Sequence, residues 1–208
     1  MIQLQTQNVG KRYGKRVLFR GMSESFEGGS VTAVTGVNGS GKSTLVRILA
    51  GVLTPGKGQV ALRISDRAIT REQHPFHIGL VAPYLNVYED FSPEENLLFL
   101  ARARGYDKPG DRIASVLERV GLPDRGKDLV KTFSSGMKQR VRIASALFFN
   151  PPVLLLDEPG SNLDESGHSL VRSIIEESAE DGRIVVLATN DDREVALCTR
   201  EVRIGDFA

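Results

Sequence analysis

A short glycine-rich segment carries the clearest chemistry in this chain. It fits the pattern of a glycine, four residues and then Gly-Lys-Ser/Thr, and it consists of Gly36, Val37, Asn38, Gly39, Ser40, Gly41, Lys42, Ser43 and Thr44. The small residues let successive backbone N–H groups turn inward, and a helix that begins near Gly41 adds the positive end of its dipole. We call residues 36–44 the phosphate loop and predict that they bind a triphosphate. Lys42 would contact the outer phosphates, and the Ser43 hydroxyl would be a ligand of Mg²⁺.

A pair of carboxylates, Asp157 and Glu158, ends a uniformly apolar run at residues 153–156. Open α/β folds place their ligands at this carboxyl edge of the sheet. Asp157 is predicted to reach the Mg²⁺ through its water shell, and Glu158 is predicted to polarise an attacking water. An acidic pair alone indicates a polar strand end or a helix cap about as often as it indicates a catalytic site. The phosphate loop in the same chain favours the catalytic interpretation.

A third segment, Ser134-Ser135-Gly136, precedes apolar residues at helical spacing. It offers a hydroxyl, close backbone approach and a helix N-terminus, all of which favour an anion. By itself, however, such a segment is most often an ordinary serine cap.

The surrounding pattern predicts an α/β fold in which the phosphate loop connects a strand at 31–34 to a helix. Short antiparallel strands are expected at the N-terminal edge, and apolar strands of a parallel sheet are expected later in the chain. The expected strands are 2–9, 17–19, 22–26, 59–64, 78–82, 153–156, 184–188 and 202–204, with a helix at 165–177.

The residue pattern becomes helical after Ser92-Pro93-Glu94-Glu95, where a serine cap and a proline begin a helix. We therefore predict a single domain over residues 1–208. Its core comprises residues 1–85 and 149–208, and a helical subdomain is inserted at 86–148.

Composition limits the class of protein. With 27 basic and 26 acidic residues the net charge is +1, so no global field favours nucleic acid. The one cysteine, Cys198, cannot form an internal disulfide, and no apolar run approaches the length of a membrane span. The chain is therefore expected to be cytosolic. His74, His77 and His168 are expected in surface or loop positions.

The order of these segments resembles the ATP-binding cassette (ABC) family over essentially all 208 residues. Residues 133–137 stand where that family has Leu-Ser-Gly-Gly-Gln, with Ser135 and Met137 as substitutions. Residues 161–164 match the family's D-loop, and residues 153–159 match its Walker B strand. Tyr13 matches the aromatic residue that stacks on adenine. The resemblance implies that Tyr13, Ser134, Ser135 and Gly136 bind nucleotide.

Two positions depart from the family pattern. The Q-loop glutamine is expected near residue 83, where this chain has Ala82-Pro83-Tyr84. The family's Thr-His-Asp is Thr189-Asn190-Asp191 here. The resemblance places Asn190 beside the γ-phosphate, so Asn190 joins Glu158 as a catalytic candidate.

The resemblance implies a P-loop NTPase fold with a RecA-like core, ATP and Mg²⁺ as ligands, and a function as the ATPase subunit of a transporter. Its implied partners are a second cassette, as a homodimer or a paired ABC ATPase subunit, and separate transmembrane permease subunits, with no nucleic acid. The implied location is cytoplasmic, peripheral on the inner face of the membrane. Two alternatives are an ATP-gated binding cassette with little hydrolysis and a soluble cassette protein outside transport.

Overall fold

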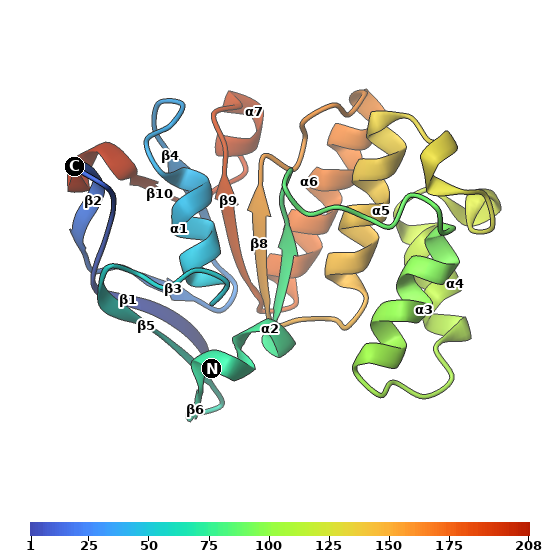
Figure 1. The fold of residues 1–208 in the computed structure, drawn as a ribbon, viewed down its shortest axis with the longest axis horizontal. Coiled ribbons are helices and arrows are strands. Elements are labelled where there is room, and N and C mark those ends of the chain that lie inside the picture. Colours follow the sequence, from blue (N-terminus) through green and yellow to red (C-terminus); the bar gives the residue numbers. More distant parts are fainter.

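The computed structural model describes residues 1–208 and contains two β-sheets with helices packed against them (Figure 1). The first sheet is antiparallel, has the order β2-β1-β5-β6, and pairs β3 with β1. Its strands are β1 (Ile2–Tyr13), β2 (Arg16–Met22), β3 (Ser25–Glu27), β5 (Lys57–Ile64) and β6 (Arg67–Ile69).

The second sheet is parallel and has the order β10-β4-β9-β8-β7. Its strands are β4 (Val31–Thr35), β7 (Ile78–Val81), β8 (Val153–Asp157), β9 (Ile184–Ala188) and β10 (Arg200–Arg203). The central position of β9, between β4 and β8, brings the segments that follow these three strands to one edge of the sheet.

Both faces of the parallel sheet are covered, which explains why β8 and β9 are apolar at every position except the terminal Asp157. Alternate residues of a strand point to opposite faces. Val153 and Leu155 pack in one core cluster, whereas Leu154 and Leu156 pack in the other. The uniform hydrophobicity of residues 153–156 thus reflects a strand buried on both sides.

The two faces are covered by different layers. On one face, α1 (Lys42–Leu49) shares a core with the antiparallel sheet. On the other face lie α5 (Ser135–Leu147) and α6 (Glu165–Glu180), and α3 (Pro93–Ala103) and α4 (Gly110–Arg119) pack beyond them (Figure 1). The short helices α2 (His74–His77) and α7 (Asp192–Val195) complete the fold with four 3₁₀ turns, at Arg71–Gln73, Pro123–Arg125, Val130–Thr132 and Ile204–Phe207.

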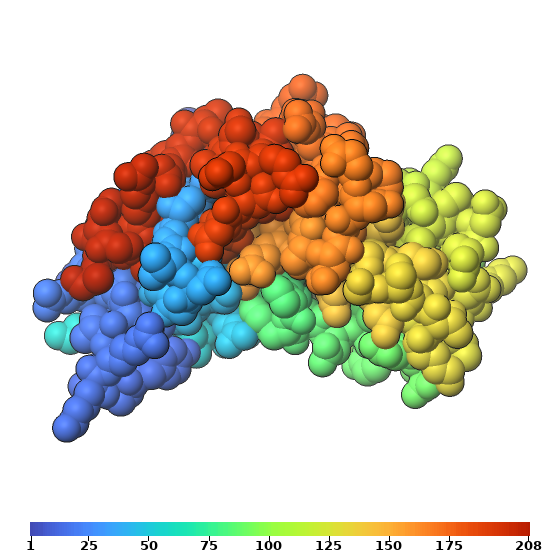
Figure 2. All heavy atoms as spheres, turned by 90° about the horizontal axis from the view of Figure 1, so that it is seen from above, coloured from blue at the N-terminus to red at the C-terminus, as the bar shows by residue number.

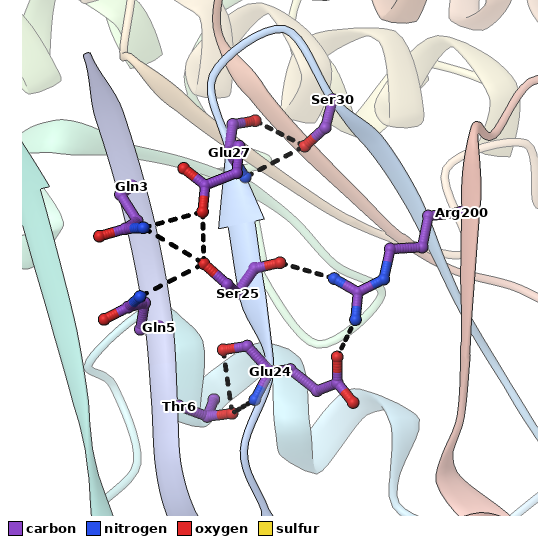
Figure 3. Close-up of polar contacts among 8 residues, drawn as sticks. All are labelled: Gln3, Gln5, Thr6, Glu24, Ser25, Glu27, Ser30 and Arg200. Atoms are coloured by element: carbon purple, nitrogen blue, oxygen red, sulfur yellow. Dashed lines mark hydrogen bonds and ion pairs between the residues drawn. The ribbon is translucent and has the colours of Figure 1, made fainter.

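A polar network holds the antiparallel sheet to the edge of the parallel sheet (Figure 3). Arg200 at the start of β10 donates to the Ser25 carbonyl at 2.6 Å and also pairs with the Glu24 carboxylate. Gln3 of β1 donates to Glu27 of β3 at 2.8 Å. The Arg200 contacts join residues at opposite ends of the chain, so the N-terminal strands are fixed relative to the sheet that carries the phosphate loop.

The predicted α/β class is confirmed, and the cap at Ser92 is as expected: its hydroxyl accepts from the Glu95 N–H at 3.2 Å. Several strand boundaries were wrong: β1, for example, continues to Tyr13 instead of ending at residue 9. The segment 22–26 is divided between β2 and β3, and the last strand ends at Arg203 because Ile204 begins a 3₁₀ turn. His74 is not a surface residue: it is 1% exposed because α2 packs it against the turn that follows α1, at Gly51.

Candidate functional site

The phosphate loop leaves the end of β4 and runs into α1 through three glycines with positive φ. Gly36, Gly39 and Gly41 have φ of 147°, 76° and 117°, a region that residues with a Cβ rarely adopt. A Cβ on Gly36 would also lie 2.8 Å from the Ser40 hydroxyl. The path of the loop therefore requires these glycines, and Gly41 is the N-cap of α1.

Lys42 folds back over its own loop. Its ammonium donates to the Gly36 carbonyl at 2.6 Å, and the residue is only 6% exposed. An ammonium group has three donors, so this contact leaves hydrogen-bonding capacity for an anion on the loop. The side chain is thus held at the place where a phosphate chain would need a positive charge.

Ser43 and Asp157, on α1 and β8, meet at the carboxyl edge of the parallel sheet. The Ser43 hydroxyl donates to Oδ1 of Asp157 at 3.1 Å, whereas the buried Oδ2 has no hydrogen-bond partner in the chain. Burial raises the pKa of Asp157, and the Ser43 hydrogen bond opposes this shift.

These donors fit a hard cation. A hydroxyl and a carboxylate are oxygen ligands of the kind that Mg²⁺ takes beside phosphate groups. No group of three or more His, Cys, Asp or Glu side chains is arranged to hold a metal. A metal ion here would therefore need water or phosphate oxygens to complete its coordination.

Glu158 is exposed and follows Asp157 with a left-handed backbone, φ 49°. This conformation is uncommon for a residue with a side chain, and strain of this kind clusters at functional sites. Its N–H donates to the Ala188 carbonyl of β9 at 2.9 Å. The turn places Glu158 in the lining of two cavities, one shared with the phosphate loop and one shared with Asn190.

Asn190 lies directly beside the phosphate loop. Its amide donates to Oδ1 of Asn38 at 2.9 Å, and both residues line a cavity of about 370 Å³ together with Glu158. The sequence places these residues 152 positions apart, and the adjacency of β4 and β9 brings them together. Asn190 can thus offer a hydrogen-bond donor where the phosphate loop opens.

Tyr13 ends β1 and lines a cavity of about 400 Å³ with Lys42, Ser43, Thr44 and Glu158. The tyrosine is 51% exposed, so its ring is available to a flat ligand at the mouth of this cavity. Base stacking on an aromatic ring needs such an accessible face.

The segment Ser134-Ser135-Gly136 lies apart from the phosphate loop and lines a separate cavity of about 610 Å³. Ser134 is the N-cap of α5 and accepts from the Met137 N–H at 3.2 Å. Viewed onto the carboxyl edge of the strands, the light-blue phosphate loop region and the yellow region near residue 130 are separated by the orange region near residue 160 (Figure 2). Within one chain, these predicted nucleotide-binding segments are not brought together.

Residue patterns gave no signal for three further side chains at this edge. Gln139, 2% exposed, donates to the Pro159 carbonyl directly after Glu158 at 2.9 Å. Arg47 lies over the ring of Tyr84, with its guanidinium carbon 3.7 Å from the ring centroid. Gln139 and Arg47 occupy polar positions within helical patterns, so only the tertiary structure shows what they contact.

The comparison with known proteins agrees with this geometry. The sequence profile of the family described as "ABC transporter" matches residues 19–161. The chain belongs to this family. The fold is accordingly that of the ABC cassettes, a P-loop NTPase fold, as predicted.

Two curated relatives and one solved structure illustrate the likeness. The linearmycin resistance ATP-binding protein of Bacillus subtilis (strain 168) is 33% identical over 95% of this chain, which spans 64% of that protein. The cytochrome c biogenesis ATP-binding export protein of Haemophilus influenzae is 32% identical over 91% of this chain and 90% of its own length. A cassette solved as a dimer in a post-hydrolysis state with ADP and Pi superimposes with a TM-score of 0.81, at 24% identity over 96% of this chain and 93% of the other.

None of the helices combines the length and the apolar character needed to span a bilayer.

Proposed function

We propose that this chain binds and hydrolyses ATP with Mg²⁺ as one subunit of an ABC transporter. The observation that carries the proposal is the contact between Ser43 and Asp157 below the phosphate loop, with Glu158 at the mouth of the same cavity. This arrangement joins a phosphate cradle, oxygen donors for a metal ion and a carboxylate base at one edge of the sheet.

Different residues of the chain bind the nucleotide and act in hydrolysis. Backbone N–H groups of residues 36–44 and the Lys42 ammonium bind the phosphates, and Tyr13 stacks on the base. Ser43 and, through water, Asp157 would hold Mg²⁺, which would supply positive charge to the phosphates. Glu158 accepts a proton from the attacking water as the water oxygen bonds to the γ-phosphorus, while the bond from that phosphorus to the β–γ bridging oxygen breaks and ADP leaves. Asn190 donates a hydrogen bond to the γ-phosphate.

The division of the chain supports a site made by two subunits. We propose a core of residues 1–85 and 149–208 and a helical subdomain of residues 86–148. The core carries the phosphate loop, and the subdomain carries Ser134, Ser135 and Gly136 in a separate cavity. A second cassette, identical or paired, would bring its own Ser134 segment to the phosphate loop of the first. The solved dimeric cassette of similar fold is consistent with this assembly.

A membrane partner has a surface available. The rings of Tyr88, Phe91 and Phe99 form a cluster, with centroids 5.4 Å and 5.2 Å from Tyr88, and are 54%, 39% and 45% exposed. Beside them lies an apolar cavity of about 250 Å³. Exposed aromatic clusters of this kind mark interaction sites. We propose that transmembrane permease subunits dock here and hold the protein on the inner face of the membrane.

Replacing Lys42 by alanine tests the site. Loss of a charge-assisted contact should cost about 1.5 to 3 kcal/mol, which lowers Mg-ATP affinity roughly ten- to hundredfold. Calorimetric titration measures the affinity, and circular dichroism shows whether the variant is folded. Lys57→Ala, at an exposed lysine of β5, is the matched control and should bind like the wild type. Equal Mg-ATP affinity in folded Lys42→Ala and wild type would contradict the assignment.

A further inference from the structure

Besides the Ser40 hydroxyl of the phosphate loop, three buried polar atoms near the carboxyl edge of the parallel sheet have no hydrogen-bond partner in the chain. They are the hydroxyl of Tyr84, Nε of Arg47 and Oδ2 of Asp157. A buried polar group without a partner costs about 1 to 3 kcal/mol, so native structures rarely keep one without a reason. Each of these groups comes from a different element: the segment after β7, helix α1 and strand β8. The convergence of unpaired groups from three elements indicates a site that is completed by binding.

The ring of Tyr84 is fixed in place. The Arg47 guanidinium lies over its face, 3.7 Å from carbon to ring centroid, and Arg47 belongs to the same helix as Ser43. The next residue, Leu85, accepts a 2.8 Å hydrogen bond at its carbonyl from Nε of Arg142 on α5. Arg47 thus holds the ring and Arg142 holds the neighbouring backbone, while the Tyr84 hydroxyl group has no hydrogen-bond partner.

The charges around the hydroxyl group keep it a donor. Burial raises the pKa of Tyr84, Arg47 opposes this shift, and the negative charge of Asp157 adds to it. The hydroxyl therefore keeps its proton at neutral pH. Strands β7 and β8 are neighbours in the sheet, with Val81 opposite Leu156. Tyr84, just after β7, and Asp157, at the end of β8, therefore lie at the same edge, where an unpaired donor and an unpaired acceptor are both present.

We propose that Tyr84 is a positioning residue of the magnesium–nucleotide site, and that its hydroxyl donates a hydrogen bond to the Asp157 carboxylate in the nucleotide-loaded protein. This inference rests on the proposed function. This hydrogen bond would satisfy both the Tyr84 hydroxyl and Oδ2 of Asp157. Because it forms only when nucleotide binds, it would contribute to the free energy of nucleotide binding. It also orients the carboxylate whose other oxygen accepts from Ser43.

The variant Tyr84→Phe keeps the ring that Arg47 covers and removes only the hydroxyl group. We expect the gain in affinity that Mg²⁺ gives a non-hydrolysable ATP analogue, measured by calorimetry in Mg²⁺ and in EDTA, to fall about three- to tenfold. Affinity in EDTA should not change. The melting temperature of the nucleotide-free protein should stay the same or rise, because an unpaired buried hydroxyl is lost, whereas the shift induced by the Mg²⁺ complex should shrink.

Tyr106→Phe is the matched control, since it makes the same chemical change at a tyrosine that packs against Phe148 and Phe149, away from the phosphate loop. It should behave like the wild type in both titrations. A structural role for the Tyr84 hydroxyl would instead lower the melting temperature of the free protein and leave the Mg²⁺ effect intact, and that result would overturn the inference. If the wild type itself failed to bind the Mg²⁺ complex, the proposed function would fall with it.

Discussion

Asn190 is the residue at which this site departs most clearly from the chemistry that the family resemblance implies. A histidine there would add positive charge when protonated, whereas an asparagine amide is a neutral donor. The structure shows this amide in contact with Asn38 of the phosphate loop at 2.9 Å. The side chain at position 190 therefore faces the phosphate loop. Histidine and asparagine differ at this position because only histidine can carry a positive charge.

Replacing Asn190 by histidine should raise ATP turnover. A charged hydrogen bond contributes about 1 kcal/mol more than a neutral one, which corresponds to roughly a five- to tenfold change in rate. Steady-state phosphate release measures the effect, and Asn190→Ala should be slower than the wild type because it has no donor. Equal turnover of the histidine variant and the wild type would show that Asn190 does not contact the reacting phosphate.

Sequence alone could predict the backbone turn of residues 36–44 and the place of Asp157 at the end of a buried strand, because local residue patterns dictate both. The positive φ values at Gly36, Gly39 and Gly41 permit few other residues, so the glycine spacing directly reflects the backbone path. The burial of His74 and the environment of Tyr84 could not be predicted in this way. Both depend on contacts with α1 or its C-terminal turn, and no spacing within the segment around either residue records that contact.

At the scale of elements, helix α5 connects the segments that border the site. Arg142 donates to the Leu85 carbonyl at 2.8 Å and to the Gln139 side chain at 3.1 Å. Gln139 in turn donates to the Pro159 carbonyl at 2.9 Å. One helix thus fixes both the segment that carries Tyr84 and the turn that carries Glu158.

Replacing Gln139 by leucine should destabilise the protein by about 1 to 3 kcal/mol, because the buried Pro159 carbonyl loses its side-chain donor. Turnover should also fall, since the turn at Glu158 is less firmly held. Urea unfolding and phosphate release measure the two effects. Gln59→Leu is the control: its hydrogen bond to Gln7 is exposed, so its loss should change stability by less than about 0.5 kcal/mol. Equal urea midpoints for Gln139→Leu and Gln59→Leu would refute the inference that α5 holds the turn at Glu158.

The reactivity of the Cys198 thiol, just after α7, tests whether the end of α7 is buried in solution. Burial raises its pKa from 9.0 to about 12, so the native thiol is protonated at pH 8 and should react slowly with a disulfide reagent. Because folding disfavours the thiolate, this group makes stability fall as pH rises between 9.0 and about 12. Reaction in the native protein as fast as in denaturant would contradict the burial of α7's end.

Elements with a strong local pattern were predicted, and those without one were not. The strands β8 and β9 have clear signals because a strand covered on both faces is a continuous run of apolar residues. Helix α3 has a clear signal because its capping box consists of residues only three positions apart. The short elements β6, α2 and α7 have only three or four residues, too few for a period to appear. Their positions follow from packing against neighbouring elements.

On the scale of the whole molecule, the phosphate loop and the N-terminus of α5 line two separate cavities. The cavity of the phosphate loop contains Lys42 and Glu158, and the cavity of the α5 N-terminus contains Ser134. The light-blue and yellow regions that carry these residues both reach the face at the carboxyl ends of the strands (Figure 2). A rigid chain cannot close one onto the other, because the residues near position 160 lie between them. Two chains facing each other can do so, and a nucleotide would then join them.

Replacing Glu158 by glutamine should therefore trap a dimer in the presence of Mg-ATP. The substitution preserves the shape of the side chain and leaves Ser43 and Asp157 intact, while it removes the base that would hydrolyse the bridging nucleotide. Size-exclusion chromatography with light scattering should show dimer with Mg-ATP and monomer in EDTA. Adding Ser134→Arg should abolish the dimer, since a bulky side chain would fill the second half-site.

The Ser134 hydroxyl also caps α5, so a control must separate this role from assembly. Ser134→Ala loses the cap, at a cost of about 1 kcal/mol in stability, without adding bulk or charge. In the Glu158→Gln background it should still dimerise with Mg-ATP, more weakly than with serine. Glu158→Gln that remains monomeric at saturating Mg-ATP, with nucleotide shown to be bound, would mean that each chain acts alone. The cavity at Ser134 would then need another ligand.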